Sequence, residues 1–273
     1  MNKTQRVILI TGTSSGIGRA CAEQLSQSGW RVYGTSREAP ATSLPGSSHR
    51  MLRMDVTDNS SVESAVRFIL EKEGRLDAVI NNAGIALAGA VEDTTLDEAS
   101  VVWETNFLGT ARVCREALPA LRASKGCLIN ISSLGGLVAL PFQAFYSASK
   151  FALEGYTEAL RAEMREHGVR VVLVEPGDFR TGMTGKRRVA AAAEGSASYG
   201  SAFKRALDII AKNEQQGSDP AKLGRALERI LANPNPRRRY RVGSTLELLL
   251  MKIYDWLPGS VAEWAIRKFY GLR

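Results

Sequence analysis

The chain of 273 residues has an ordinary globular composition, with 44% hydrophobic and 23% charged residues. This length allows one large α/β domain with a substantial core, and we expect one domain rather than two. The net charge of +8 admits nucleic acid, an anionic membrane surface or phosphorylated ligands as partners. The densest basic run, Arg237 to Arg239, has no interleaved aromatic residues, so we predict a solvated strand end and no nucleic-acid partner.

The cysteines and the chain start indicate the cellular setting. Cys21, Cys114 and Cys127 are odd in number, widely spaced and set among apolar residues, so we predict buried reduced thiols. No Cys/His/Asp cluster has metal-ligand spacing, and no metal site is expected. The start, MNKTQRVILITG, has no small-residue cleavage site, and the apolar stretch LELLLMKI at 246–253 is too short to span a bilayer. We expect a cytoplasmic protein.

The first half of the chain alternates short apolar runs with helical patterns. VILI at 7–10 predicts a buried strand, and the glycine-rich TGTSSGIG leads from it into a helix. Further strands are predicted at WRVYGTS (30–36), HRMLRMD (49–55) and LDAVINNAG (76–84), with a helix between the last two. This order is strand, glycine loop, helix and strand again.

The alternation continues in the second half. We predict a helix around 97–122, a strand at 127–132, a helix from about 146 to 167 and a strand at 169–176. Such alternation gives right-handed crossovers, so the predicted fold class is α/β. We expect a single doubly wound, Rossmann-like domain over residues 1–243, in which helices cover both faces of a parallel sheet.

Two segments depart from the regular alternation. The segment 183–203 lacks a firm period, and we predict that it is mobile and closes over the substrate. Residues 244–273 carry two apolar stripes at helical spacing, which predict an amphipathic helical C-terminal extension. The extension either packs over the substrate pocket or against a partner subunit, or lies on an anionic membrane as a peripheral contact.

The glycine loop fits a dinucleotide phosphate. Glycines in the spacing G-x-x-x-G-x-G stand between a predicted strand and a predicted helix, so the backbone can approach a pyrophosphate at the helix N-terminus. We therefore predict a nicotinamide dinucleotide cofactor. The predicted cradle consists of Gly12, Ser14, Ser15, Gly16, Ile17 and Gly18.

The end of the second strand indicates which nicotinamide cofactor is bound. An acidic residue there would bind the ribose hydroxyls of NAD, whereas an arginine would bind the 2′-phosphate of NADP. Arg37 is the first residue after the strand, and Glu38 comes one place later. We predict NADP(H) in preference to NAD(H). The alternatives are that Arg37 is a solvated surface charge or that Glu38 points inward.

Five further motifs occur in order beside the predicted strands: NNAG (81–84), TNFLG (105–109), NISSLGG (130–136), YSASK (146–150) and PGDFRT (176–181). Together with TGTSSGIG they resemble the short-chain dehydrogenase/reductase family over about residues 5–182. The resemblance implies an NADP-dependent oxidoreductase acting on CH–OH and C=O groups. It also implies a homodimer or homotetramer.

The resemblance implies a catalytic set of Asn106, Ser133, Tyr146 and Lys150. Tyr146 would pass a proton to or from the substrate oxygen as hydride moves, and Ser133 would hold that oxygen, with Ser132 the structural neighbour. Lys150 would bind the nicotinamide ribose, and its charge should lower the pKa of Tyr146 toward neutrality. Asn106 would continue a proton relay through water, or would be a structural residue that distorts a helix.

The remaining cofactor contacts also follow from the resemblance. Asp55 and Val56 are expected near the adenine, although Asp55 could instead cap a turn. Thr181 is expected at the carboxamide. The other implied contacts are Asn82, Ala83, Gly84, Tyr146, Lys150, Pro176 and Gly177.

The stretch SSLGGLVALPFQAFYSASKFALEG is similar to the steroid and retinol branch of the family, including the 17β-hydroxysteroid dehydrogenases. This implies a small hydrophobic ketone, aldehyde or alcohol of steroid, retinoid or lipid type, in contact with Ser133, Leu134, Phe142 and Tyr146. Two alternatives stay open. One is a 3-oxoacyl thioester reductase, and the other is a non-catalytic protein that senses NADP(H).

Overall fold

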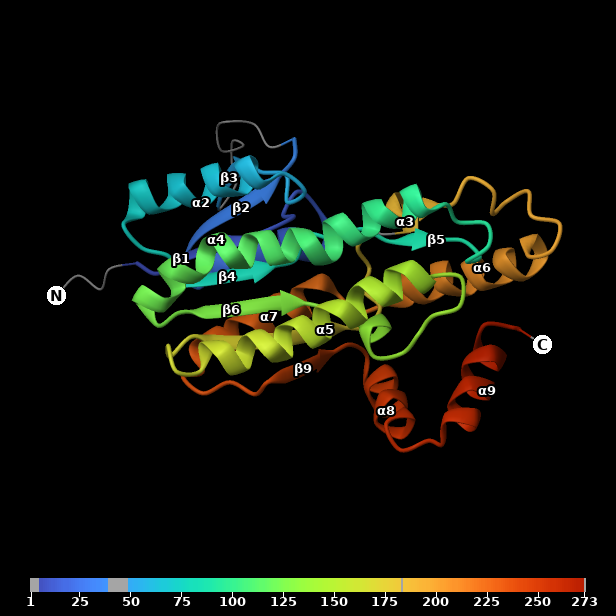
Figure 1. Cartoon of the computed structure of the whole chain (residues 1–273). Coiled ribbons are helices and arrows are strands. Elements are labelled where there is room, and N and C mark those ends of the chain that lie inside the picture. The colour runs from blue at the N-terminus through green and yellow to red at the C-terminus, as the bar shows by residue number, and fades with distance from the viewer. Residues whose placement is uncertain (1–4, 39–48, 183, 273) are drawn as a thin grey trace.

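The computed structural model describes residues 5–38, 49–182 and 184–272. Within them a seven-stranded sheet has the order β3-β2-β1-β4-β6-β7-β9, and every neighbouring pair is parallel (Figure 1). The sheet grows outward in both directions from β1 and β4, which confirms the predicted doubly wound topology. The strands are β1 (Val7–Ile10), β2 (Arg31–Ser36), β3 (Arg50–Arg53), β4 (Ala78–Asn81), β6 (Cys127–Ile131), β7 (Arg170–Pro176) and β9 (Arg239–Val242).

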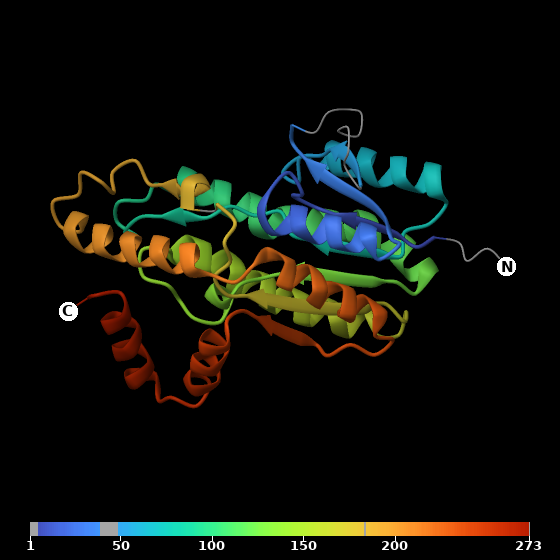
Figure 2. The ribbon, with the colours of Figure 1, turned by 180° about the vertical axis from the view of Figure 1, so that it is seen from behind.

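Helices cover both faces of this sheet. One face carries α2 (Asn59–Glu73), α4 (Gly109–Ser124) and α5 (Ala144–Met164), and the other carries α1 (Gly16–Gln27) and α7 (Pro220–Ala232) (Figures 1 and 2). Alternate residues of β1 serve the two faces, since Val7 and Leu9 join one apolar cluster while Ile8 and Ile10 join the other. The core therefore has two halves separated by the sheet.

The helix expected around 97–122 is interrupted. It consists of α3 (Leu96–Trp103), a π-helical turn at Glu104–Leu108, and α4. A reciprocal capping box between Thr95 and Glu98 fixes the start of α3. The π-helical turn contains Asn106, and such turns within α-helices often occur at functional sites.

The segment 184–203 contains a 3-10 turn at Thr184–Lys186 and the strand β8 (Arg188–Val189), which pairs with β5 (Leu87–Ala88). Ala190 and Ala193 are buried against Phe203 of α6 (Gly200–Gln216). The segment thus has packing partners. Its mobility and its closure over the substrate stay predictions, and residue 183 lies outside the described residues.

The chain ends in two helices, α8 (Thr245–Tyr254) and α9 (Gly259–Phe269), which form a V-shaped hairpin at the side of the molecule (Figure 1). Tyr270 and Ile266 of this hairpin pack against Ala206 and Ile210 of α6. No helix of the described residues is long and apolar enough to cross a membrane.

The prediction for the cysteines is confirmed, whereas the prediction for the basic run is wrong for one of its arginines. All three cysteines are buried and free, as predicted. The solvated environment predicted for the basic run is wrong for Arg239, whose side chain is only 33% exposed and pairs with Glu154, Glu158 and Glu175. Strand β9 draws Arg239 to the edge of the sheet, where α5 and β7 supply these carboxylates.

Candidate active site

The glycine loop between β1 and α1 leaves no room for side chains. Gly12 has φ +71°, and a Cβ placed on it would lie 2.9 Å from Ala83 Cα. A Cβ on Gly18 would lie 2.1 Å from the Gly12 carbonyl oxygen. The first turn of α1 holds no acidic residue and no side-chain cap, so its amide groups are available to an anion. These features fit the pyrophosphate of a dinucleotide.

Asn82 braces this loop from the neighbouring strand. Its amide nitrogen donates to the carbonyl oxygens of Thr11 and Gly12 at 2.9 and 3.0 Å, while Thr11 Oγ1 accepts from the backbone nitrogens of Asn82 and Ala83. Gly84 follows, and a Cβ on it would lie 3.7 Å from Lys150 Nζ. The NNAG motif therefore connects the phosphate loop to Lys150.

Asn106 is fully buried, and its side chain is committed to the backbone. Its Oδ1 accepts from the Ile85 amide at 2.8 Å, and its Nδ2 donates to the Ile85 carbonyl and to Ser149 Oγ, both at 3.0 Å. Both amide hydrogens are thus used. This geometry fixes the segment after NNAG against α5, and the water relay expected for Asn106 stays a prediction.

Ser133 and Tyr146 lie together at the carboxyl end of β6. Burial raises the pKa of Tyr146 above its ordinary value. A hydrogen bond between the side chains of Ser133 and Tyr146 acts in the opposite direction and lowers this pKa. A Cβ on Gly135 would lie 3.4 Å from Ser133 Oγ and 3.2 Å from the Tyr146 ring, so this glycine makes room for the pair. The neighbouring Ser132 is buried on the side of Gly136, away from the phenol.

The pKa of Tyr146 is raised, against the expected lowering, because burial outweighs the opposing influences of Ser133 and Arg187. The expected influence of Lys150 on this pKa stays a prediction. Lys150 is itself buried, its Nζ donates to the Ile131 carbonyl at 2.9 Å, and burial lowers its pKa to about 8. The phenol is therefore held in its protonated form.

The adenine end of the site is more open. Arg37 is exposed directly after β2, and no described residue forms an ion pair with it. The carboxylate of Asp55 accepts from the Thr57 amide at 2.9 Å, so it closes a turn, while Val56 is buried against Gly109. Their expected contacts with the adenine stay predictions.

The remaining predicted residues have these positions. A Cβ on Gly16 would lie 3.2 Å from Thr181 Cβ, which places the end of PGDFRT beside the phosphate loop. In the phosphate loop, Ser14 is exposed, the Ser15 hydroxyl accepts a hydrogen bond from Lys186, and the Ile17 side chain packs on the core. Pro176 is the last residue of β7, and Gly177 lies against Glu247. Leu134 directly follows Ser133. Phe142, in the left-handed region at φ +60°, packs edge-on against Phe203.

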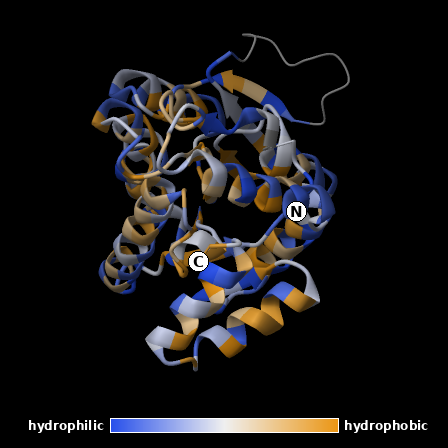
Figure 3. Cartoon of the chain, turned by 90° about the vertical axis from the view of Figure 1, so that its right-hand side faces the viewer, coloured by the Kyte–Doolittle hydropathy of each residue, from blue (hydrophilic) through white to orange (hydrophobic). Residues whose placement is uncertain are grey.

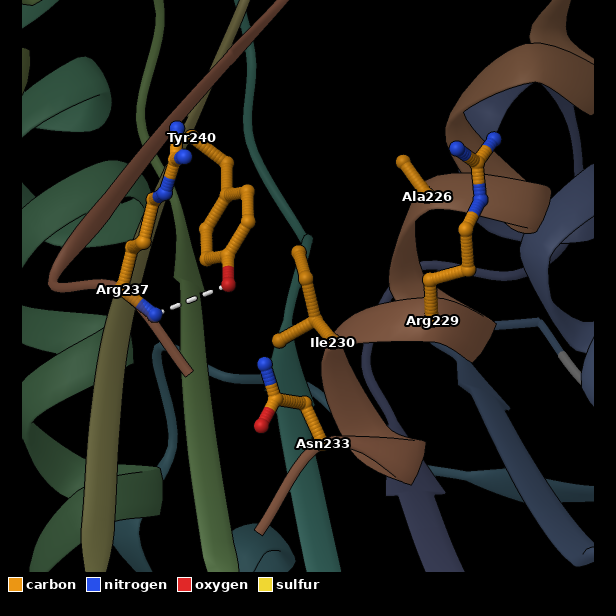
Figure 4. A pocket seen from close by; sticks show the side chains of 6 residues that line it. All are labelled: Ala226, Arg229, Ile230, Asn233, Arg237 and Tyr240. Atoms are coloured by element: carbon orange, nitrogen blue, oxygen red, sulfur yellow. Dashed lines mark hydrogen bonds between the residues drawn. The ribbon is translucent and has the colours of Figure 1, made fainter. Parts of the chain in front are cut away.

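A separate hollow of about 310 Å³ lies between α7 and β9, lined by Ala226, Arg229, Ile230, Asn233, Arg237 and Tyr240 (Figure 4). The backbone nitrogen of Arg237 donates to the Tyr240 hydroxyl at 2.8 Å across it. The hollow lies at the amino end of β9, whereas ligands of parallel sheets bind beyond the carboxyl ends. We therefore do not place the reaction there.

A family model described as short chain dehydrogenase matches residues 6–192, which include the glycine loop, Ser133, Tyr146 and Lys150. The chain belongs to the short-chain dehydrogenase family. It is accordingly an oxidoreductase that uses a nicotinamide cofactor and interconverts CH–OH and C=O groups.

Similar proteins include a 3-ketodihydrosphingosine reductase from Bacteroides thetaiotaomicron, 45% identical over 98% of this chain and 99% of the relative. A solved short-chain dehydrogenase from Streptomyces avermitilis has a TM-score of 0.83 at 33% identity, covering 97% of this chain and 98% of the other. Dehydrogenase/reductase SDR family member 7B from Bos taurus is 35% identical over 65% of this chain and 59% of its own length.

Charged side chains that the sequence analysis did not identify lie around the phenol of this dehydrogenase. Arg187 and Glu214 form a deeply buried ion pair, and their charges and that of Asp178 all act on the pKa of Tyr146. Burial and the neighbouring Glu247 raise the pKa of Asp178 to about 6. These residues come from the loop after β7, the position just before β8 and the end of α6, so no local motif could indicate that they meet.

A buried ionic network runs from the active site to the C-terminal hairpin. Glu154, one turn after Lys150 on α5, acts on the lysine and pairs with Arg239 at 2.6 Å. Arg239 also pairs with Glu175 at 2.6 Å. From there Arg241 joins Glu175 to Asp255 of α8.

Proposed function

We propose that this chain reduces a long-chain amino ketone, 3-ketodihydrosphingosine, with NADPH as the hydride donor. Ketone, NADPH and a proton become a secondary alcohol and NADP⁺. The Bacteroides relative supports this substrate because its 45% identity extends over 98% of the chain, the C-terminal helices included. The proposal rests mainly on three features that lie near one another: the phenol of Tyr146, the carboxylate of Asp178, and an apolar wall that contains Leu140 and Phe142.

The phenol suits reduction. Burial raises the pKa of Tyr146, so at neutral pH the side chain is protonated and able to donate to a developing alkoxide. Ser133, in hydrogen-bonding contact with Tyr146, can hold the same oxygen. NADPH, when bound, supplies the hydride, and the protein supplies position and the proton.

The carboxylate suits the amine of the substrate. 3-Ketodihydrosphingosine carries an amine on the carbon next to its ketone, and this amine is protonated at neutral pH. Asp178 acts electrostatically on Tyr146, and no described residue donates a hydrogen bond to its carboxylate. An ammonium group next to the reacting carbonyl would therefore find a carboxylate that accepts no hydrogen bond from a described residue and is influenced by Arg187 only at a distance.

The apolar wall suits the alkyl chain. Leu140 lies beside the active site, since a Cβ on Gly135 would be 3.1 Å from its Cδ1 and 3.2 Å from the Tyr146 ring. Leu140 and Phe142 pack in turn against the cluster formed by Ala206 and Ile210 of α6 and Tyr270 of the hairpin. A long apolar chain that leaves the carbonyl along this wall would stay out of water.

The function is tested by following NADPH consumption with three substrates: 3-ketodihydrosphingosine, a ketone of equal length that lacks the amine, and an acetoacetyl thioester. We expect the highest kcat/KM for the amino ketone. Preference for the thioester would instead identify a 3-oxoacyl thioester reductase. Tight NADPH binding without turnover of any substrate would favour the sensor and contradict the proposal.

Asp178→Asn should raise the KM for the amino ketone by about tenfold to a hundredfold, because a charge-assisted hydrogen bond is lost. The KM for the amine-free ketone should stay nearly constant. Asp208→Asn, at an exposed carboxylate of α6, is the matched control and should change neither value. Equal losses on both ketones would assign Asp178 a structural role.

Arg37→Ala should raise the KM for NADPH by about tenfold or more, because the 2′-phosphate loses its cation. The KM for NADH should change little. Arg67→Ala, at an exposed arginine of α2, serves as the control for the loss of one positive charge. If wild-type protein already prefers NADH, the assignment of Arg37 to the 2′-phosphate is wrong.

A further inference from the structure

The outer side of the α8–α9 hairpin is unusually apolar. Within the part of the chain that the structure describes, eight of the fourteen exposed large hydrophobic side chains belong to this hairpin. Figure 3 shows the two helices protruding at the bottom of the view with hydrophobic stretches in orange. We call these residues the hairpin surface: Leu246, Leu249, Leu250, Ile253, Trp256, Val261, Trp264 and Phe269.

The hairpin is a fixed part of the fold. Glu247 caps α8 through Ser244 and also accepts from the Asp178 amide at 2.7 Å, while Asp255 pairs with Arg241 at 2.6 Å. The inner side of α9 packs on α6 through Ile266 and Tyr270. The hairpin surface is thus held outward by contacts on its opposite side.

Charge around this surface is mainly positive. Lys252, Arg267 and Lys268 are exposed, and none of them forms an ion pair with a described residue. Of the acidic residues of the hairpin, Asp255 is paired with Arg241 and Glu247 is used in the cap, which leaves the exposed Glu263 of α9 against three cations. The whole chain also carries a net charge of +8.

We propose that the hairpin surface binds an anionic lipid bilayer, with both helices lying in its interfacial layer. Trp256 and Trp264 are 90% and 60% exposed, and tryptophan favours the boundary between headgroups and acyl chains. The cations would meet lipid phosphates. A symmetric dimer through the same face would instead bring these cations toward their own copies, which is unfavourable.

Docking in this orientation would bring the apolar wall of Leu140 and Phe142 near the lipid, because this wall and α9 pack on the same cluster of α6 residues. A long-chain ketone could then pass from the bilayer to Tyr146 with little exposure to water. Lipid binding itself does not require the proposed function. It is therefore measured without turnover.

The test is co-sedimentation of the full chain with vesicles of phosphatidylcholine alone or mixed with phosphatidylglycerol. We expect binding to the mixed vesicles, weakened about tenfold or more by Trp256→Ser with Trp264→Ser. Neutralising Lys252, Arg267 and Lys268 to glutamine should weaken it about fivefold per charge on the anionic vesicles. The control is Val91→Ser with Leu96→Ser, which removes two side chains that are 63% and 77% exposed elsewhere.

Two results would overturn the proposal. One is wild-type protein that stays in the supernatant with both vesicle types. The other is a tryptophan double variant that binds as well as the control. If that variant changes from dimer to monomer in light scattering while wild type ignores vesicles, the hairpin surface joins two copies of the chain instead.

Discussion

Tyr146→Phe should lower kcat for ketone reduction by about 10²- to 10⁴-fold, because the ring stays in place while the proton donor is lost. Tyr146 forms a side-chain hydrogen bond with Ser133 at the end of β6, and burial keeps its phenol protonated. The Kd for NADPH should change little, since phenylalanine preserves the packing. The measurement is single-turnover reduction together with NADPH fluorescence on binding.

Tyr240→Phe is the matched control for this substitution. Its hydroxyl accepts from the Arg237 amide at the opposite end of the sheet, so kcat should stay at the wild-type value. A Tyr146→Phe protein that binds NADPH normally and keeps wild-type kcat would remove Tyr146 from the proton-transfer step.

Arg239→Met should lower the free energy of unfolding by about 3–5 kcal/mol at pH 8, because the buried Glu154 loses its cation and Glu175 keeps only Arg241. Glu175 is fully buried and Glu154 nearly so, and both lie 2.6 Å from the guanidinium. Chemical denaturation at several pH values measures the loss. Arg238→Met, at the exposed neighbouring arginine, should stay within about 0.5 kcal/mol of wild type.

The loss in Arg239→Met should depend on pH with a definite sign. Burial already raises the pKa of Glu154, and Arg239 opposes that rise. Without the arginine the folded-state pKa rises further above the unfolded value, so stability is retained at low pH and lost as pH rises through the folded-state pKa. The deficit should therefore be smaller at pH 5 than at pH 8. A deficit independent of pH would assign Arg239 a packing role.

The sequence predicts the sheet well because the sheet depends on local signals, and a local motif also places Ser133 near Tyr146, while the catalytic roles stay predictions. Strand β1, its glycine turn and α1 follow one another along the chain, and alternation then fixes a parallel doubly wound sheet. The Ser133–Tyr146 contact follows a family motif at the end of β6. Local order is enough for these features.

Other features depend on contacts between distant segments. A helix distortion is one of the two alternatives for Asn106, and the structure shows it as a π-helical turn, whose form the sequence does not give. The basic run around Arg239 predicts a surface charge, but β9 pairs with β7 at the sheet edge and brings Arg239 to buried carboxylates. The ion pair of Arg187 with Glu214 likewise depends on the packing of α6 near the segment before β8. The periodicity of 244–269 predicts two helices, but it does not show that their apolar residues face outward.

The most direct test of the proposed reaction is deuterium transfer. Full-length protein is incubated with 3-ketodihydrosphingosine and NADPH deuterated at the nicotinamide C4, and the product is analysed by mass spectrometry. We predict dihydrosphingosine with one deuterium on the former carbonyl carbon, formed at similar rates by wild type and Tyr240→Phe and at least about a hundredfold more slowly by Tyr146→Phe. Wild-type protein that binds NADPH yet forms no deuterated alcohol would contradict it.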